Sequence, residues 1–215
     1  MAENPIGKNF KVNIFFANKC CNYFRKPFEG VSLSRFLVHI EFDLHIAMTT
    51  AAALLFSFED EPALLYGRLG YVLGHEWSHL VGPTNAGWER RFNQSQYIEK
   101  LSCIAQTYNC SVNTLSEDFA DISGIQIAFQ TFEKKLGKDG LKFRPFENCF
   151  FNNEQLFFIS LAHYYCGEYP TDENGPHSHA RLRILNTLRN SPAFANAFNC
   201  PLWSPMNAVD KCQIW

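Results

Sequence analysis

A short histidine motif, GHEWSH at residues 74–79, constrains this chain of 215 residues more than any other stretch. It matches the pattern H-E-x-x-H, with His75 and His79 four residues apart. On a helix, that spacing places both imidazoles on one face, where they can share a Zn2+ ion. Glu76 then lies beside the metal and can act as general base toward a zinc-activated water. The motif predicts a hydrolytic zinc site, and the alternative is an ordinary helix that carries two histidines.

The pattern around the motif is helical, because Pro62 follows acidic residues, apolar residues recur at helical spacing, and Gly82-Pro83 provides a stop. We therefore expect a helix across residues 59–82. Partial alternation of apolar residues within 34–58 predicts a strand before it. Further helices are expected at about residues 86–108, 113–136, 153–166, 177–190 and 192–198. The expected fold class is mainly α with a small β segment.

A catalytic zinc site needs a third protein ligand and an open coordination position. The best candidate lies in NTLSEDFADISG, residues 113–124, where Glu117 and Asp121 are four residues apart and share one helix face. Glu117 can serve as the ligand, and Asp121 can accept the second ring proton of a metal-binding histidine. The alternative is a solvated acidic helix face, and the presence of GHEWSH favours the metal site.

A third cluster, GPHSHARLRI at residues 175–184, carries His177 and Arg183. A histidine or arginine near a zinc hydrolase site can stabilise the oxyanion of a tetrahedral intermediate. A basic helix start that faces water explains the same residues equally well.

Charge and cysteine usage narrow the partners and the compartment. The formal net charge is -2 and no basic stripe is present, which argues against nucleic acid as the main partner. No run of 18 apolar residues exists, so no membrane span is expected. The eight cysteines include no C-x-x-C pair, and two N-x-[ST] sequons accompany them, which favours disulfides in an oxidising compartment. The first residues do not have the pattern of a signal peptide.

Several segments together resemble the C-terminal catalytic region of the neprilysin family of zinc metallopeptidases. They are GRLGYVLGHEWSH, TLSEDFADISGIQIAF, NEQLFFISLAHYYCGEY, HSHARLRILNTLRNSPAFANAFNC and the terminal CQIW, in family order. The resemblance covers roughly residues 40–215. It implies a zincin-like catalytic domain at residues 36–215, without the family's N-terminal enclosing region, after a poorly patterned segment at 1–35.

The resemblance also implies a role for each candidate residue. The implied catalytic roles are general base catalysis by Glu76, orientation of a zinc-bound histidine and assistance in proton transfer by Asp121, and oxyanion stabilisation by His177. The resemblance also implies zinc ligation by His75, His79 and Glu117, binding of a substrate carbonyl by Arg183, and a disulfide between Cys103 and Cys212. It further implies Zn2+ as cofactor, peptides as substrates, and a location that is secreted or on the extracellular face of the membrane.

The sequence departs from the family pattern around this site. Asp118 stands where the family has asparagine, the upstream stretch LVHIEF lacks the substrate-binding asparagine, and LVGPTNAGW replaces an acidic, glycine-containing stretch. The leading hypothesis is a zinc metalloendopeptidase. The second is a catalytically weak or inactive truncated relative that keeps zinc for stability and acts as a binding or regulatory protein. A third is an incomplete product that folds poorly because some cysteines lack their expected partners.

Overall fold

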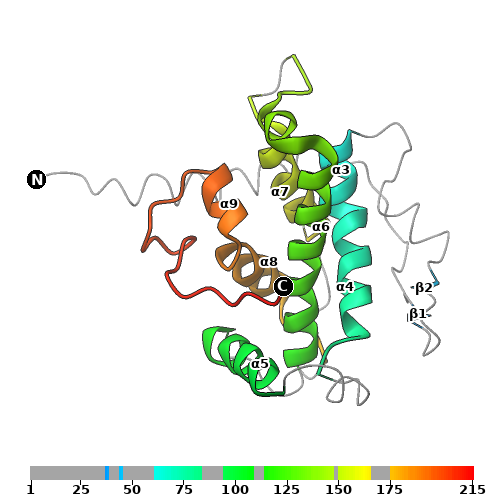
Figure 1. Ribbon diagram of the computed structural model, residues 1–215, viewed down its shortest axis with the longest axis vertical. Coiled ribbons are helices and arrows are strands. Elements are labelled where there is room, and N and C mark those ends of the chain that lie inside the picture. The colour runs from blue at the N-terminus through cyan, green and yellow to red at the C-terminus, as the bar shows by residue number, and fades with distance from the viewer. Residues whose placement is uncertain are drawn as a thin grey trace, which may run out of the picture.

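The chain is mainly helical in the computed structural model (Figure 1), as the sequence predicted. The structure describes residues 37–38, 44–45, 61–83, 94–108, 114–147, 150–165 and 175–215. Its helices are α3 (Pro62–Leu65), the π-helical turn η1 (Tyr66–Gly70), α4 (Tyr71–His79), α5 (Gln94–Tyr108), α6 (Leu115–Lys142), α7 (Asn153–Tyr164), α8 (Ala180–Arg189) and α9 (Pro192–Ala197).

The helix boundaries follow local sequence signals. The segments α3, η1 and α4 form one helical run, because the backbone stays in the right-handed helical region across both junctions. Asn152 and Gln155 form a reciprocal capping box at the start of α7. The backbone leaves helical geometry at Gly137 (φ 70°), one residue after the predicted end of the third helix.

Two short strands precede the helical part of the chain. Strand β1 (Leu37–Val38) pairs antiparallel with β2 (Leu44–His45), and β1 lies beside α4. The rest of the stretch in which the sequence predicted a strand, 34–58, lies outside the described residues, as do residues 86–93 of the second predicted helix.

Helices α4 and α6 lie side by side along most of α4 (Figure 1). Two glycines make their close approach possible. A Cβ atom on Gly74 would lie 2.8 Å from the carbonyl oxygen of Gly124, and one on Gly124 would lie 2.8 Å from the backbone nitrogen of His75. Both distances are shorter than side chains tolerate, so any larger residue would push the two helices apart.

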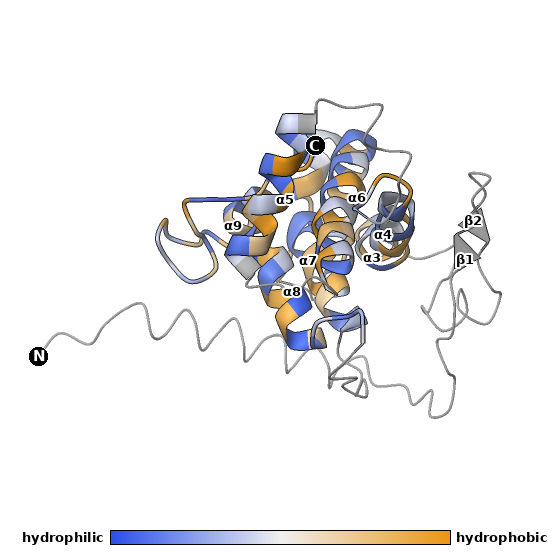
Figure 2. Cartoon of the chain, turned by 90° about the horizontal axis from the view of Figure 1, so that it is seen from below, coloured by the Kyte–Doolittle hydropathy of each residue, from blue (hydrophilic) through white to orange (hydrophobic). Residues whose placement is uncertain are grey.

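An aromatic core joins α6 to α7. The rings of Phe132 and Phe157 stack with centroids 5.3 Å apart, and those of Phe129 and Phe158 stack at 5.2 Å. Burial of one such side chain contributes roughly 1.5–3 kcal/mol relative to leaving it exposed. Figure 2 shows that the helices carry both apolar and polar residues, as expected for amphipathic helices that cover a core.

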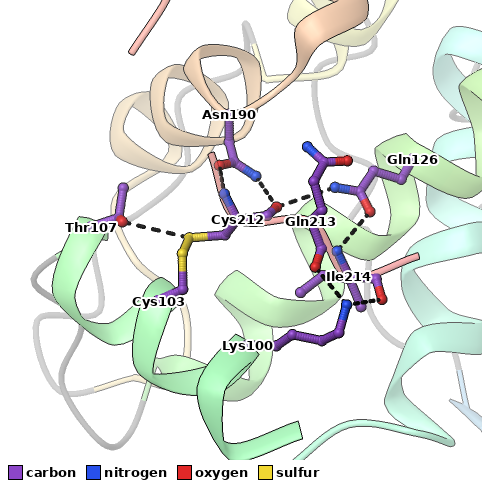
Figure 3. The surroundings of a disulfide bond; sticks show 8 residues. All are labelled: Lys100, Cys103, Thr107, Gln126, Asn190, Cys212, Gln213 and Ile214. Atoms are coloured by element: carbon purple, nitrogen blue, oxygen red, sulfur yellow. Dashed lines mark hydrogen bonds between the residues drawn. A yellow bond between two sulfur atoms is a disulfide. The ribbon is translucent and has the colours of Figure 1, made fainter. Parts of the chain in front are cut away.

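The C-terminal tail returns to the helices through a disulfide. Cys212 is bonded to Cys103 on α5, which confirms the pairing implied by the resemblance (Figure 3). Asn190, at the end of α8, binds the backbone of Cys212 twice: its Oδ1 accepts from the amide at 2.5 Å and its Nδ2 donates to the carbonyl at 2.6 Å. The tail is therefore tied to α5 and α8.

The last residues are also tied to α5 and α6 (Figure 3). Lys100 donates to the carbonyls of Gln213 and Ile214 at 2.8 and 2.9 Å. Gln126 on α6 accepts from the amides of Ile214 and Trp215 at 3.1 and 3.2 Å. Ile214 is buried in a small apolar cluster between these helices. Within the described part of the chain, no helix has the length and apolarity needed to cross a bilayer.

Candidate metal centre

The end of α4 and the start of α6 bring together the three residues that the sequence proposed as metal ligands. The Nε2 atoms of His75 and His79 lie 3.2 Å apart. Oε2 of Glu117 lies 3.2 Å from Nε2 of His75, and its Oε1 lies 3.5 Å from Nε2 of His79. Glu117, which follows His79 by 38 residues in the sequence, thus presents its ligand atoms to the same point as the two histidines.

The arrangement of these three side chains fits a zinc ion. Ligand atoms of a tetrahedral Zn2+ site, each about 2.0–2.1 Å from the metal, lie roughly 3.3 Å from one another. The observed separations of 3.2 to 3.5 Å agree with that value. In addition, Oε2 of Glu117 is buried and accepts no hydrogen bond of normal geometry. Two imidazoles and one carboxylate form a donor set typical of catalytic zinc, which leaves a fourth position open.

The electrostatics of the three residues are strongly coupled. Burial lowers the pKa of His75, but the carboxylates of Asp121 and Glu117 outweigh it and raise the pKa to about 9. Burial raises the pKa of Glu117, but the imidazoles of His177 and His75 lower it well below its ordinary value. Burial dominates at His79 and lowers its pKa. A carboxylate that stays ionised is therefore held against the imidazoles of His75 and His79.

Glu76 follows His75 directly and is partly buried. Burial raises its pKa, and the nearby charges of His75, Glu117 and His177 act on it as well. Its carboxylate is thus electrostatically coupled to the metal centre, and its elevated pKa is a property suited to a general base.

Asp121 lies one turn after Glu117 and is almost fully buried, with 1% of its surface exposed. Its Oδ1 lies 2.9 Å from Nδ1 of His75, where the sequence expected the acceptor for a zinc-binding histidine. Arg183 on α8 binds the same carboxylate with two hydrogen bonds, from Nε to Oδ2 at 2.7 Å and from Nη2 to Oδ1 at 2.6 Å. Burial raises the pKa of Asp121, but the guanidinium of Arg183 and the His75 contact lower it well below its usual range.

His177 precedes α8 and lies on the open side of the centre. Its Nε2 is 3.1 Å from Oε2 of Glu117, and about half of its side chain, 52%, is exposed. The loop that carries it is held on α6, because Ser178 donates to Asp118 at 3.4 Å. Asp118, the residue that departs from the family pattern, is buried at this contact.

The sequence interpretation missed two residues of the site and one pairing. The missed residues are Tyr71 and Tyr165, whose hydroxyls lie at the Asp121 carboxylate. Tyr71 stands four residues before His75, so its spacing was an available signal, whereas nothing in the sequence marks Tyr165. The ion pair between Arg183 and Asp121 was also not anticipated.

A comparison with protein families gives this geometry its context. The family model for Peptidase family M13 matches residues 41–214. The chain therefore belongs to peptidase family M13, a family of zinc metallopeptidases, and the resemblance to the neprilysin family is confirmed.

Curated relatives lead to the same family. Neprilysin-1 of Caenorhabditis elegans is 34% identical over 182 residues, which cover 71% of this chain and 24% of that protein. Endothelin-converting enzyme 1 of Bos taurus is 29% identical over 177 residues, covering 71% of this chain and 23% of the relative. Human neprilysin is 29% identical over 187 residues, covering 74% and 25%. The chain thus spans about a quarter of the length of these relatives.

Solved structures share the fold. The zinc metalloprotease ZMP1 of Mycobacterium tuberculosis in its open state aligns with a TM-score of 0.66 at 18% identity, over 80% of this chain and 31% of that one. The Haemonchus galactose-containing glycoprotein complex aligns with a TM-score of 0.64 at 21% identity, over 80% and 33%. At these identities the likeness supports the mainly helical fold and no finer statement.

Proposed function

We propose that residues 36–215 form the catalytic domain of a zinc-dependent metalloendopeptidase that hydrolyses peptide bonds of small peptides. The observation that carries the proposal is the convergence of His75, His79 and Glu117 at zinc-ligand spacing, with Glu76 directly beside them. Membership of family M13 supports it, because its members are zinc metallopeptidases.

The bound ion would polarise the scissile carbonyl and lower the pKa of a water molecule. Glu76 accepts a proton from the attacking water and passes it to the leaving amine, as a general base and then a general acid. His177 lies on the exposed side of the centre, where its imidazole donates a hydrogen bond to the oxyanion that develops on the carbonyl oxygen.

Two further charged residues, Asp121 and Arg183, support this chemistry. Asp121 contacts Nδ1 of His75 and so fixes the ring with Nε2 directed to the metal. Arg183 uses two of its five N–H donors on Asp121. We propose that its other donors hold a backbone carbonyl of the peptide substrate, the role that the family resemblance implies.

A disulfide supports a location outside the reducing cytosol. The bond between Cys103 and Cys212 is of the kind that persists in oxidising compartments. We propose that the domain acts as a secreted protein or on the extracellular face of a membrane.

A second function is favoured by the sequence around the site. The stretch LVHIEF lacks the asparagine with which the family holds substrate backbone. A relative that binds zinc for stability, cleaves little and acts as a binding or regulatory protein would keep the zinc ligands and lack this substrate-binding asparagine.

Metal analysis and a peptide-cleavage assay on the wild type and Glu76→Gln separate the two functions. For the peptidase, we expect one bound Zn2+ in both proteins and a rate that falls about 10²- to 10⁴-fold in the variant. Bound zinc without turnover, unchanged in Glu76→Gln, supports the binding protein instead. A folded wild-type protein that binds no zinc would refute both.

A further inference from the structure

Two tyrosine hydroxyls form a chain behind the metal centre. The hydroxyl of Tyr71 donates to Oδ1 of Asp121 at 2.6 Å. The hydroxyl of Tyr165 is hydrogen-bonded to that of Tyr71 and also donates to the same Oδ1 at 3.4 Å. A hydroxyl has one proton, and Tyr71 uses its proton on Asp121, so the proton of Tyr165 serves both the Tyr71 hydroxyl and Oδ1 of Asp121. Tyr165 therefore reaches Asp121 through Tyr71 and by a longer direct hydrogen bond.

These hydrogen bonds end on the oxygen of Asp121 that contacts His75. Oδ1 of Asp121 is the atom that lies 2.9 Å from Nδ1 of His75, whose Nε2 faces Glu117. Arg183 grips both carboxylate oxygens and sets the plane of the carboxylate. Tyr71 donates to Oδ1 as well, so its hydroxyl acts together with Arg183 in fixing where that oxygen lies relative to the His75 ring.

Tyr165 supports both partners of Asp121. Its hydroxyl donates to Tyr71, and its ring lies below the guanidinium of Arg183, with Cζ 5.5 Å from the ring centroid. The two tyrosines also come from different elements, Tyr71 from α4 and Tyr165 from the residue after α7. The contacts of the two tyrosines and Arg183 thus join α4, α6, α7 and α8 at one buried carboxylate.

Phenylalanine would fill the same space with an equally apolar ring, and a buried hydroxyl destabilises unless it is hydrogen-bonded. What tyrosine adds at these two positions, compared with phenylalanine, is therefore the directed hydrogen bond of its O–H group. Groups that bind the far nitrogen of a metal-binding histidine fix the ring and raise the affinity for the metal.

We propose that Tyr71 and Tyr165 are positioning residues of the metal centre, which hold the Asp121 carboxylate so that it orients His75 toward Zn2+. The inference rests on the proposed function and adds to it two residues that act through Asp121 on the ligand set.

The test uses Tyr71→Phe, Tyr165→Phe, the double variant, and Tyr66→Phe as matched control. Tyr66 lies on the same helical run as Tyr71 and packs its ring on Phe132, with centroids 5.7 Å apart. Zn2+ affinity is measured by competition with a chelator, and the geometry of the centre by the visible absorption spectrum of the Co2+-loaded protein. Urea unfolding of each zinc-free protein measures any purely structural effect.

We expect Tyr71→Phe to lower Zn2+ affinity about 10-fold and to change the Co2+ spectrum. Tyr165→Phe should have a smaller effect of the same kind. The double variant should lose more affinity than Tyr71→Phe alone, because Tyr165 also donates directly to Asp121. Tyr66→Phe should leave both readouts unchanged.

Wild-type zinc binding together with unchanged affinity and Co2+ spectra in both single variants would overturn the inference alone. Loss of urea stability without any change at the metal would do the same, because it would show a structural role only. A wild-type protein that binds no Zn2+ would overturn the proposed function and the inference with it. If Tyr71→Phe does not fold, the comparison of Tyr165→Phe with Tyr66→Phe decides.

Discussion

The two parts of α6 have opposite surroundings. Its first turns present Glu117 and Asp121 to imidazoles, a guanidinium and hydroxyls, whereas the turns that follow present Phe129 and Phe132 to the phenylalanines of α7. Apolar burial does not depend on direction, while the contacts of the first part depend on the position of single atoms. The comparison assigns stability to the aromatic part of α6 and the proposed metal centre to its polar part.

The largest expected effect comes from the aromatic part. Phe132→Ala removes a fully buried ring and should lower the free energy of unfolding by about 3–5 kcal/mol. Protein that remains folded should keep wild-type zinc affinity. Urea unfolding and chelator competition measure the two properties, with Phe150→Ala, at an exposed ring, as control. A loss of zinc affinity in folded Phe132→Ala would break the proposed division of α6.

Metal removal addresses the polar part. A ligand that binds only the folded protein at 100 times its Kd stabilises it by about 2.7 kcal/mol. We expect Zn2+ to raise the unfolding midpoint of the wild type accordingly. The variant His79→Ala should show no such rise, because one of the ligands is missing. An equal rise in both proteins would place the zinc elsewhere.

The crossing of α4 and α6 links the two parts. Gly124→Ala places a Cβ against the backbone of His75 and should lower the free energy of unfolding by about 1–3 kcal/mol. It should also weaken zinc binding, since His75 and Glu117 are carried on the helices that separate. Gly70→Ala is the control, because its Cβ would meet only the Tyr66 side chain at ordinary contact distance. Unchanged zinc affinity in Gly124→Ala would contradict a site set by the crossing.

The smallest effect is expected at the tail. Gln126→Ala removes the acceptor of the amides of Ile214 and Trp215 and should lower the free energy of unfolding by about 1 kcal/mol. Zinc affinity should fall less than in Gly124→Ala, because the disulfide still holds the tail. A larger loss of affinity than in Gly124→Ala would show that the tail, and not the crossing, sets the ligand positions.

Local patterns allowed much of this arrangement to be predicted. The spacing of His75 and His79, and that of Glu117 and Asp121, reflects the period of a single helix, so each pair could be read within one segment. Pro62, Gly82 and Gly137 mark helix limits in the same local way.

The remainder depends on contacts between segments far apart in the sequence. Gly74 meets Gly124, and Arg183 meets Asp121, only after the helices pack, and no local period records such meetings. Tyr165 follows the end of α7 in a stretch rich in aromatic residues, where its hydroxyl has no distinguishing pattern. The candidate ligands were therefore easier to predict than the contacts that hold them in place.

The disulfide between Cys103 and Cys212 would link oxidation of the chain to the proposed metal centre. The bond closes the tail over Phe119, two residues after Glu117, in one apolar cluster. Oxidation of the two thiols therefore favours the packed form of the helix that carries Glu117, a proposed zinc ligand. Because such coupling is reciprocal, zinc bound at the proposed centre would make the disulfide harder to reduce by the same free energy. In a chain that enters an oxidising compartment before it meets zinc, the disulfide would already hold α6 in the packed form that favours metal binding.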